Sequence, residues 1–254
     1  NETETKVFQQ NQLTVKIYPT VQQMGKAAAQ EVADRICNLL EGKAEINMIF
    51  AAAPSQEEFL HHLISDQRIS WNRINAFHMD EYIGVLPDAP QSFGNFLRIR
   101  IFDKVPFKNV YYLNGHATDL EEECTRYTSL LSQFPTDIVC LGIGENGHIA
   151  FNDPDVANFN DHKLVKIVKL DHVCRQQQVN EKCFETLEQV PTEALTLTIP
   201  ALLKAKWMFC IVPFKNKAQA VYRTIHGDIS EKCPASILRR KEKSSLYLDT
   251  ESAQ

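Results

Sequence analysis

Two hydrophobic periods alternate along the chain. Apolar residues at every second position, or in short continuous runs, predict strands. These predicted strands cover residues 13–18, 46–51, 73–79, 137–143, 164–168, 194–199, 207–212 and 246–248. Apolar residues at helical spacing predict helices over residues 21–40, 93–102, 120–131 and 217–225, a further helix beginning at Ser55, and a short one opened by Pro200. Strands that alternate with helices are typical of a mainly parallel sheet covered on both faces.

The segments that connect these elements favour a single domain. The chain has 254 residues and nine glycines, without an internal repeat, a low-complexity tract or a Gly/Ser linker. Ser55 with Glu58 three residues later has the form of a capping box, which fits a helix start. We therefore predict a single domain over residues 1–254, with a doubly wound, Rossmann-like, three-layer α/β fold.

Composition narrows the function classes. A net charge of −5 and no basic run exclude a nucleic-acid binder on electrostatic grounds. No apolar stretch approaches the ~18–20 residues of a membrane-spanning helix, and the acidic, polar start is unlike a secretory signal. The seven cysteines form no Cys-x-x-Cys pair, and no Cys/His group has zinc-ligand spacing. We expect a cytoplasmic protein with reduced thiols and no metal.

Two carboxylates directly follow the predicted strand over residues 73–79. In α/β sheets, ligands bind beyond the carboxyl ends of the strands, so Asp80 and Glu81 occupy a position of interest. Such a pair commonly caps a helix or lies in a solvated turn. An aspartate partly buried among Phe77, Met79 and Tyr82 is the alternative, since burial raises its pKa toward the range useful for a general base.

A glycine-rich loop follows the most apolar predicted strand. Gly142-Ile143-Gly144-Glu145-Asn146-Gly147-His148 lacks both the dinucleotide fingerprint and the Gly-Lys-Ser/Thr ending of a phosphate P-loop. The loop presents His148, with Asp153 five residues later. A loop histidine usually has no special role, but an imidazole with a nearby carboxylate is a proton-transfer pair.

The segments after two further predicted strands are suited to bind an anion. Lys217 stands at the start of a predicted helix, and residues 51–55 lead from a strand into another helix. Free N–H groups at helix starts bind phosphate, with Ser55 as an added donor. A surface lysine and close helix–strand packing are the simpler interpretations. Together with the carboxylate and the imidazole, these positions predict a small phosphorylated substrate and proton-transfer chemistry.

At these motifs the chain resembles the glucosamine-6-phosphate deaminase/isomerase family. The resemblance rests on Met79-Asp80-Glu81-Tyr82 and on the segment from Gly144 to Pro154, and it extends from the first strand to about Leu238. The related 6-phosphogluconolactonases typically have Asp-Glu-Arg at the acidic motif, and Ala-Ser-Leu-Phe-Pro after the Gly-His. Asp80-Glu81-Tyr82 and Phe151-Asn152-Asp153-Pro154 therefore favour the deaminase branch.

The resemblance implies roles for particular residues. Asp80 would be the base that moves a proton from C2 to C1 of an open-chain amino sugar, and His148 the acid that assists ring opening. Asp153 would support the histidine, while Lys217 and Arg175 would bind phosphate. Substrate or phosphate contacts would also come from Ala52, Ala53, Ser55 and Gly147. The resemblance implies a small phosphorylated sugar as partner, no cofactor, and a homo-oligomer as one arrangement.

Two departures from the family pattern bear on activity. Asn146 replaces the usual aspartate of Asp-Gly-His, among the catalytic residues, and Glu145 and Glu81 are the candidates to compensate. Residues 51–55, Ala-Ala-Ala-Pro-Ser, replace a Gly-Gly-Thr type of phosphate loop. Three hypotheses follow: an amino-sugar-6-phosphate deaminase/isomerase, a 6-phosphogluconolactonase-like hydrolase, and a catalytically impaired paralogue that binds sugar phosphates.

Overall fold

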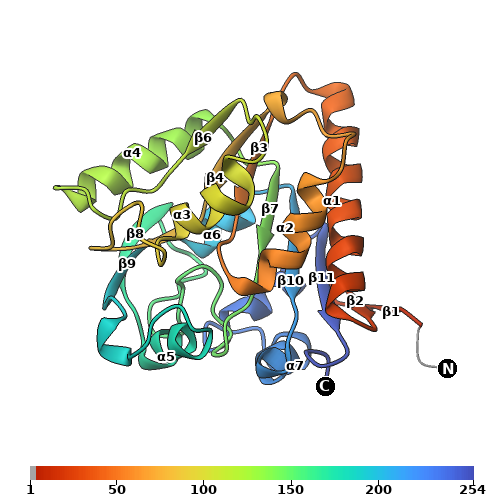
Figure 1. Ribbon diagram of the computed structural model, residues 1–254. Coiled ribbons are helices and arrows are strands. Elements are labelled where there is room, and N and C mark those ends of the chain that lie inside the picture. The colour runs from red at the N-terminus through yellow and green to blue at the C-terminus, as the bar shows by residue number, and fades with distance from the viewer. Residues whose placement is uncertain (1–3) are drawn as a thin grey trace.

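The computed structural model describes residues 4–254 and contains a large, mostly parallel sheet (Figure 1). Residues 1–3, part of the acidic start and of the predicted domain, lie outside the described residues. The strand order is β1-β2-β11-β10-β7-β3-β4-β6, and β1 is antiparallel to β2. The strands are β1 (Lys6–Gln10), β2 (Leu13–Tyr18), β3 (Ile46–Phe50), β4 (Ile74–His78), β6 (Asn109–Tyr111), β7 (Ile138–Leu141), β10 (Trp207–Val212) and β11 (Ser244–Asp249).

Helices cover both faces of this sheet. They are α1 (Val21–Gly42), α2 (Glu57–Ile64), α3 (Phe93–Leu97), α4 (Leu120–Gln133), α5 (His172–Asn180), α6 (Ile199–Leu203) and α7 (Ala218–His226). The side chains of α1, α2 and α3 pack into one hydrophobic core, and those of α4, α6 and α7 into a second. Strand β7 serves both, since Cys140 belongs to the first core and its neighbours Val139 and Leu141 to the second. The predicted three-layer α/β fold is confirmed.

A small antiparallel sheet lies beside the large one. It joins β5 (Asp80–Tyr82), β9 (Glu193–Leu197) and β8 (Val165–Lys169), in the order β5-β9-β8. The sequence predicts the strands β8 and β9 but not their separation from the main sheet. Strand β5 follows β4 after a single residue, Met79, whose carbonyl accepts a hydrogen bond from Leu197 N at 2.8 Å. Asp80 therefore lies where the chain passes from one sheet to the other.

The predicted capping box at Ser55 is not formed. A 3-10 turn (Pro54–Gln56) precedes α2, and no side chain caps either element. Ser55 Oγ instead accepts a hydrogen bond from Gln56 Nε2 at 3.2 Å. The same Gln56 amide donates to the carbonyls of Leu141 (3.3 Å) and Ile211 (3.1 Å), which ties this loop to β7 and β10.

The other predicted helices are present, with small differences at their ends. Helix α3 continues into a π-helical turn (Arg98–Phe102), so that the two together span the predicted 93–102 helix. Strands β1, β5 and β6 and helix α5 are additions that the hydrophobic pattern does not predict. Among residues 4–254, no helix is both long and apolar enough to span a membrane.

Candidate active site

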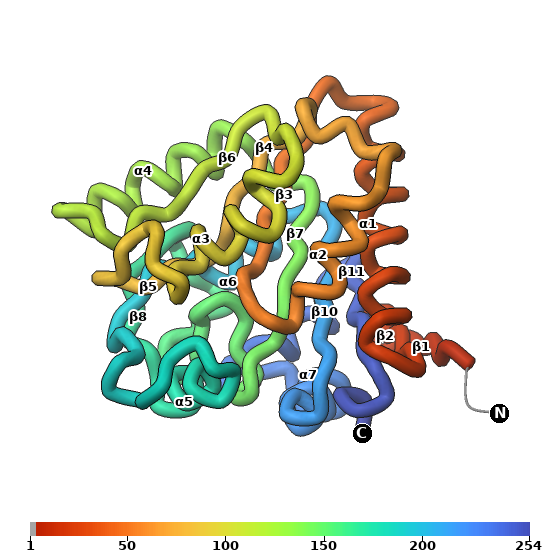
Figure 2. Tube along the Cα trace, in the orientation of Figure 1, coloured from red at the N-terminus to blue at the C-terminus, as the bar shows by residue number. Residues whose placement is uncertain are grey.

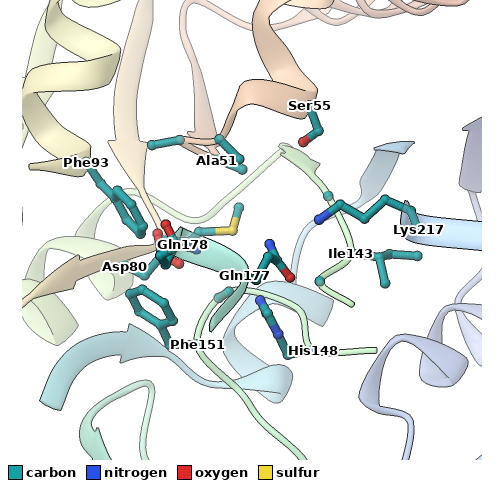
Figure 3. Close-up of a pocket in the computed structure, with 16 residues that line it drawn as sticks. Ala51, Ser55, Asp80, Phe93, Ile143, His148, Phe151, Gln177, Gln178 and Lys217 are labelled. Carbon is teal, nitrogen blue, oxygen red and sulfur yellow. The ribbon is translucent and has the colours of Figure 1, made fainter. Parts of the chain in front are cut away.

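The segments that follow β3, β7 and β10 meet at one edge of the large sheet (Figure 2). A pocket forms there, lined by residues from these segments, from the end of β4 and from α5. Its free space is about 50 Å³, which is room for a few water molecules. Asp80, Phe93 and Phe151 lie at one end of the pocket and Lys217 at the other, with His148 between them (Figure 3).

Asp80 is a buried carboxylate that faces this pocket. Its residue is 7% exposed, and its surroundings include the rings of Phe93 and Phe151 (Figure 3). Burial raises the pKa of Asp80 well above its usual value, and the neighbouring charge of Glu81 raises it further. A carboxylate in such surroundings holds a proton strongly, as a base that removes a proton from carbon requires.

Glu81 serves the fold and does not line the pocket. Its carboxylate accepts hydrogen bonds from Ser92 Oγ (2.9 Å), Phe93 N (3.0 Å) and Gly94 N (2.9 Å) at the start of α3, and from Tyr82 N (3.0 Å). A carboxylate satisfies the free N–H groups of a helix start and interacts favourably with the helix dipole. The structure therefore does not bring Glu81 toward His148 as a substitute for the missing aspartate.

Two glycines give the loop after β7 its shape. Gly144 N donates to the His148 carbonyl at 2.9 Å, and a Cβ on Gly144 would lie 1.8 Å from the Cε1 atom of the imidazole. Gly147 has a φ of +84°, and a Cβ there would lie 2.7 Å from Cys233 Sγ. Gly147 does not line the pocket, contrary to the substrate contact predicted for it. Its carbonyl accepts from Ala235 N at 2.9 Å, so its part is to shape the turn.

The amide of Asn146 joins His148 to two carboxylates. Its Nδ2 donates to Asp171 Oδ2 at 2.8 Å and to Asp153 Oδ1 at 3.2 Å. Its Oδ1 accepts from His148 N at 3.0 Å and lies 2.5 Å from His148 Nδ1. Carboxylates only accept hydrogen bonds, so the NH₂ group must face them and the carbonyl oxygen must face the imidazole.

This orientation determines the tautomer of His148. A carbonyl oxygen cannot donate, so the proton of the neutral ring is on Nδ1, and Nε2 keeps its lone pair. Burial, and to a smaller extent the charge of Lys217, lower the pKa of His148 to about 4. Asp153 Oδ1 also lies 3.4 Å from Nδ1. At neutral pH the side chain of His148 is therefore an uncharged imidazole, whose Nε2 can accept a proton.

One group of side chains has the composition of a metal site. The ligand atoms of His148, Asp153 and Cys174 lie within 4.8 Å of one another. However, His148 Nδ1 already faces Asn146, and the two oxygens of Asp153 accept from Asn146 Nδ2 and from Asp171 N (3.0 Å). Hydrogen bonds within the protein therefore account for the position of these groups.

The anion end of the pocket contains the residues that the sequence placed there, apart from Gly147 and Arg175. Ala52, Ala53, Ser55 and Lys217 all line the pocket. Lys217 is 2% exposed, and its Nζ lies 3.2 Å from Glu181 Oε1. The lysine is therefore already paired with an acid inside the protein.

Arg175 does not line the pocket. Its guanidinium instead donates to the carbonyls of Leu187 (2.8 Å) and Val190 (3.1 Å). Glu145 also points away, since its carboxylate accepts from Asn216 Nδ2 at 2.8 Å. Glu145 acts on His148 only through its charge, which raises the pKa of the imidazole against the larger effect of burial.

Several pocket residues escape the sequence analysis. Gln177 and Gln178 lie on α5, and Phe93 and Phe151 flank Asp80. The signal for α5 is Asp171, whose side chain accepts from Cys174 N at 2.7 Å as a helix N-cap. Such an aspartate before a mostly polar segment is a weak signal without a clear apolar stripe behind it.

Comparisons with known proteins agree with this architecture. The family described as glucosamine-6-phosphate isomerases/6-phosphogluconolactonase matches residues 19–247. The chain belongs to this family. It is 40% identical over 185 residues to a glucosamine-6-phosphate deaminase of Bacillus cereus (strain B4264), which covers 73% of this chain and 69% of the relative. A glucosamine-6-phosphate deaminase of Listeria innocua is 36% identical over 209 residues, or 82% of this chain and 87% of the relative.

Solved structures of family members show the same fold. A monomeric glucosamine-6-phosphate deaminase superposes with a TM-score of 0.85 at 32% identity, covering 94% of this chain and 98% of the other. The 6-phosphogluconolactonase of Thermotoga maritima gives a TM-score of 0.76 at 21% identity, covering 94% of this chain and 100% of the other. The second likeness concerns the fold alone.

Proposed function

We propose that this protein is an amino-sugar-6-phosphate deaminase/isomerase, which converts a 2-amino-2-deoxyhexose 6-phosphate and water into a ketohexose 6-phosphate and ammonia. The observation that carries the proposal is that Asp80 and the neutral His148 share one pocket with Lys217. A proton acceptor for carbon at one end and a cation at the other suit a six-carbon substrate that has a phosphate at its far end. The deaminases among its relatives support the same assignment.

Ring opening uses His148. Nε2 of the neutral imidazole accepts the proton of the C1 hydroxyl, C1 becomes a carbonyl, and the bond between C1 and the ring oxygen breaks. The imidazolium then returns the proton to the ring oxygen, so the histidine acts first as a base and afterwards as an acid. Asn146 stabilises the charged intermediate, because its carbonyl oxygen faces Nδ1 and its NH₂ group binds Asp153 and Asp171.

Isomerisation uses Asp80. Its carboxylate removes the proton from C2 of the open-chain sugar while the C1 carbonyl oxygen takes a proton from the substrate's own ammonium group, which gives an enolamine. The carboxyl group of Asp80 then delivers its proton to C1. The product is an imine at C2. Water adds to this carbon and ammonia leaves, which yields the ketone. Burial of Asp80 among Phe93 and Phe151 excludes water from the proton in transit.

Two assays separate this function from its alternatives. Purified protein is supplied with glucosamine 6-phosphate or galactosamine 6-phosphate and released ammonia is measured, with the C2-deuterated substrate used to detect a primary isotope effect. We expect ammonia release and an isotope effect on it. Hydrolysis of 6-phosphogluconolactone without ammonia from either amino sugar would refute the proposal in favour of a lactonase. Binding of the amino-sugar phosphates without any turnover would refute it in favour of a sugar-phosphate-binding protein.

The variant Asp80→Asn tests the role of the base. We expect turnover to fall by about 10²–10⁴-fold, the contribution typical of a general acid or base. Asp88→Asn makes the same chemical change at an exposed position and serves as the matched control, with turnover unchanged. Full activity in Asp80→Asn, with both variants folded by circular dichroism, would remove Asp80 from the mechanism.

A further inference from the structure

The cation at the anion end of the pocket is not free to meet a phosphate. Among the described residues that line the pocket, Lys217 is the only lysine or arginine. Its Nζ lies 3.2 Å from Glu181 Oε1, and the two side chains are 3% and 10% exposed. Water screens such a buried pair much less than a surface pair. The charge of the lysine is therefore cancelled by a residue of the same chain.

Glu181 is held at this position by few other contacts. It follows α5 directly, and its Oε1 also lies 3.3 Å from Gln177 Nε2. Its second oxygen, Oε2, is buried without a hydrogen-bond partner in the structure. A buried oxygen without a donor is unfavourable, so the ion pair with Lys217 is the main interaction that keeps the carboxylate inside. A competing anion on Lys217 would release it.

The remaining groups near Lys217 do not add positive charge to the pocket. Arg175 is bound to the carbonyls of Leu187 and Val190, away from the pocket. The loop after β3 has alanines at positions 51–53, and Pro54 has no N–H group to offer. Only the hydroxyl of Ser55 remains there as a side-chain donor. A phosphate dianion therefore meets one lysine that already has a counter-ion.

We propose that Glu181 determines how strongly the site prefers phosphorylated over neutral sugars, as the resident counter-ion of Lys217. A phosphate binds Lys217 only by displacing the Glu181 carboxylate, so the protein binds phosphate more weakly than the lysine alone would allow. A sugar without a phosphate group leaves the ion pair between Glu181 and Lys217 in place, so its binding does not depend on displacing Glu181. This inference rests on the proposed function only in naming the anion as the phosphate of the substrate.

The first test measures phosphate binding without any turnover. Isothermal titration calorimetry with inorganic phosphate gives the Kd of the full chain, of Glu181→Gln, and of Glu185→Gln. Glu185 is exposed in the same segment and loses the same charge. We expect Glu181→Gln to tighten phosphate binding about tenfold or more, the effect of freeing one charge-assisted contact. We expect Glu185→Gln to leave the Kd unchanged.

Two further variants show whether the effect passes through the lysine. In Glu181→Gln/Lys217→Met the gain should vanish, so that the double variant binds phosphate no better than Lys217→Met. Glu181→Asp keeps the charge but withdraws it by one methylene, and should also tighten binding if Glu181→Gln does not fold. An unchanged or weaker affinity in both Glu181 variants would overturn the proposal. An equal gain in Glu185→Gln would do the same, because it would show a general charge effect.

Steady-state kinetics distinguish this inference from the proposed function. In Glu181→Gln, KM for glucosamine 6-phosphate should fall while the binding of unphosphorylated glucosamine stays the same. Tighter phosphate binding in a protein that turns over no amino sugar would support the role of Glu181 and refute the deaminase. Ammonia release with no change in phosphate affinity would do the reverse.

Discussion

The variant Asn146→Asp restores the residue that the family usually has before Gly-His, and the structure predicts that it destabilises this protein. The Asn146 NH₂ group donates to Asp153 Oδ1 at 3.2 Å and to Asp171 Oδ2 at 2.8 Å. An aspartate would replace both donations with contacts between carboxylates. Three acids would then share one partly buried network.

The magnitude follows from the two hydrogen bonds. A hydrogen bond to a charged group contributes about 1.5–3 kcal/mol, so the loss of both costs about 3–6 kcal/mol when all three acids are ionised. The native protein can reduce this cost by binding a proton, which raises a native pKa of the cluster above its value in the unfolded chain. Stability then rises as the pH falls, so the penalty is largest at neutral pH and above.

Urea denaturation at several pH values measures this penalty. Asp171→Asn is the matched control, because it removes a charge and keeps an oxygen that can cap Cys174 N. In Asn146→Asp/Asp171→Asn the amide and the acid exchange places across the 2.8 Å contact, so about half of the loss should return. The contact with Asp153 remains repulsive. Equal stability of Asn146→Asp and the unchanged protein at neutral pH would refute the reasoning, as would a double variant that is merely the sum of the singles.

Two other predictions concern Glu81 and the cysteines. Glu81→Gln should lower the free energy of unfolding by about 1–3 kcal/mol through weaker capping of α3, which urea unfolding measures. The same variant should move the acid limb of kcat/KM to lower pH, because the charge of Glu81 raises the pKa of Asp80. A pH–rate profile with an unshifted acid limb would contradict this second prediction. In the folded protein an aromatic disulfide reagent should react only with the half-buried Cys37 and Cys183. Early reaction of more than two thiols would contradict the burial of Cys124, Cys140, Cys174, Cys210 and Cys233.

The large sheet is well predicted from the sequence because its strands are buried on both faces. Such strands are continuous apolar runs, as in β7 and β10, and their pattern needs no knowledge of partners. The strands that the pattern misses depend on their neighbours. β5 and β6 have three residues each, too few to show a period, and β1 is mostly exposed at the sheet edge.

The candidate site likewise has residues that the sequence predicts and residues that it does not. Asp80, His148 and Lys217 lie in segments that follow β4, β7 and β10, and the topology of a parallel sheet brings such segments to one edge. The ion pair of Glu181 with Lys217 and the hydrogen bonds that hold Arg175 outside the pocket depend on contacts that no local sequence pattern encodes. Glu81 shows the limit of reasoning from motifs. Asp80 and Glu81 are adjacent in one motif, yet Asp80 faces the pocket while Glu81 caps helix α3.

The position of Asn146 shows why one residue of a motif is a poor measure of activity. An amide at this position looks like the loss of the carboxylate that supports the histidine. In this loop the negative charge lies one hydrogen bond further away, on Asp153 and Asp171, and the amide connects it to His148. The network therefore keeps an acceptor on Nδ1 and acidic charge behind it. Its capacity to stabilise an imidazolium depends on the whole network, so Asp153→Asn and Asp171→Asn together should impair ring opening more than either alone.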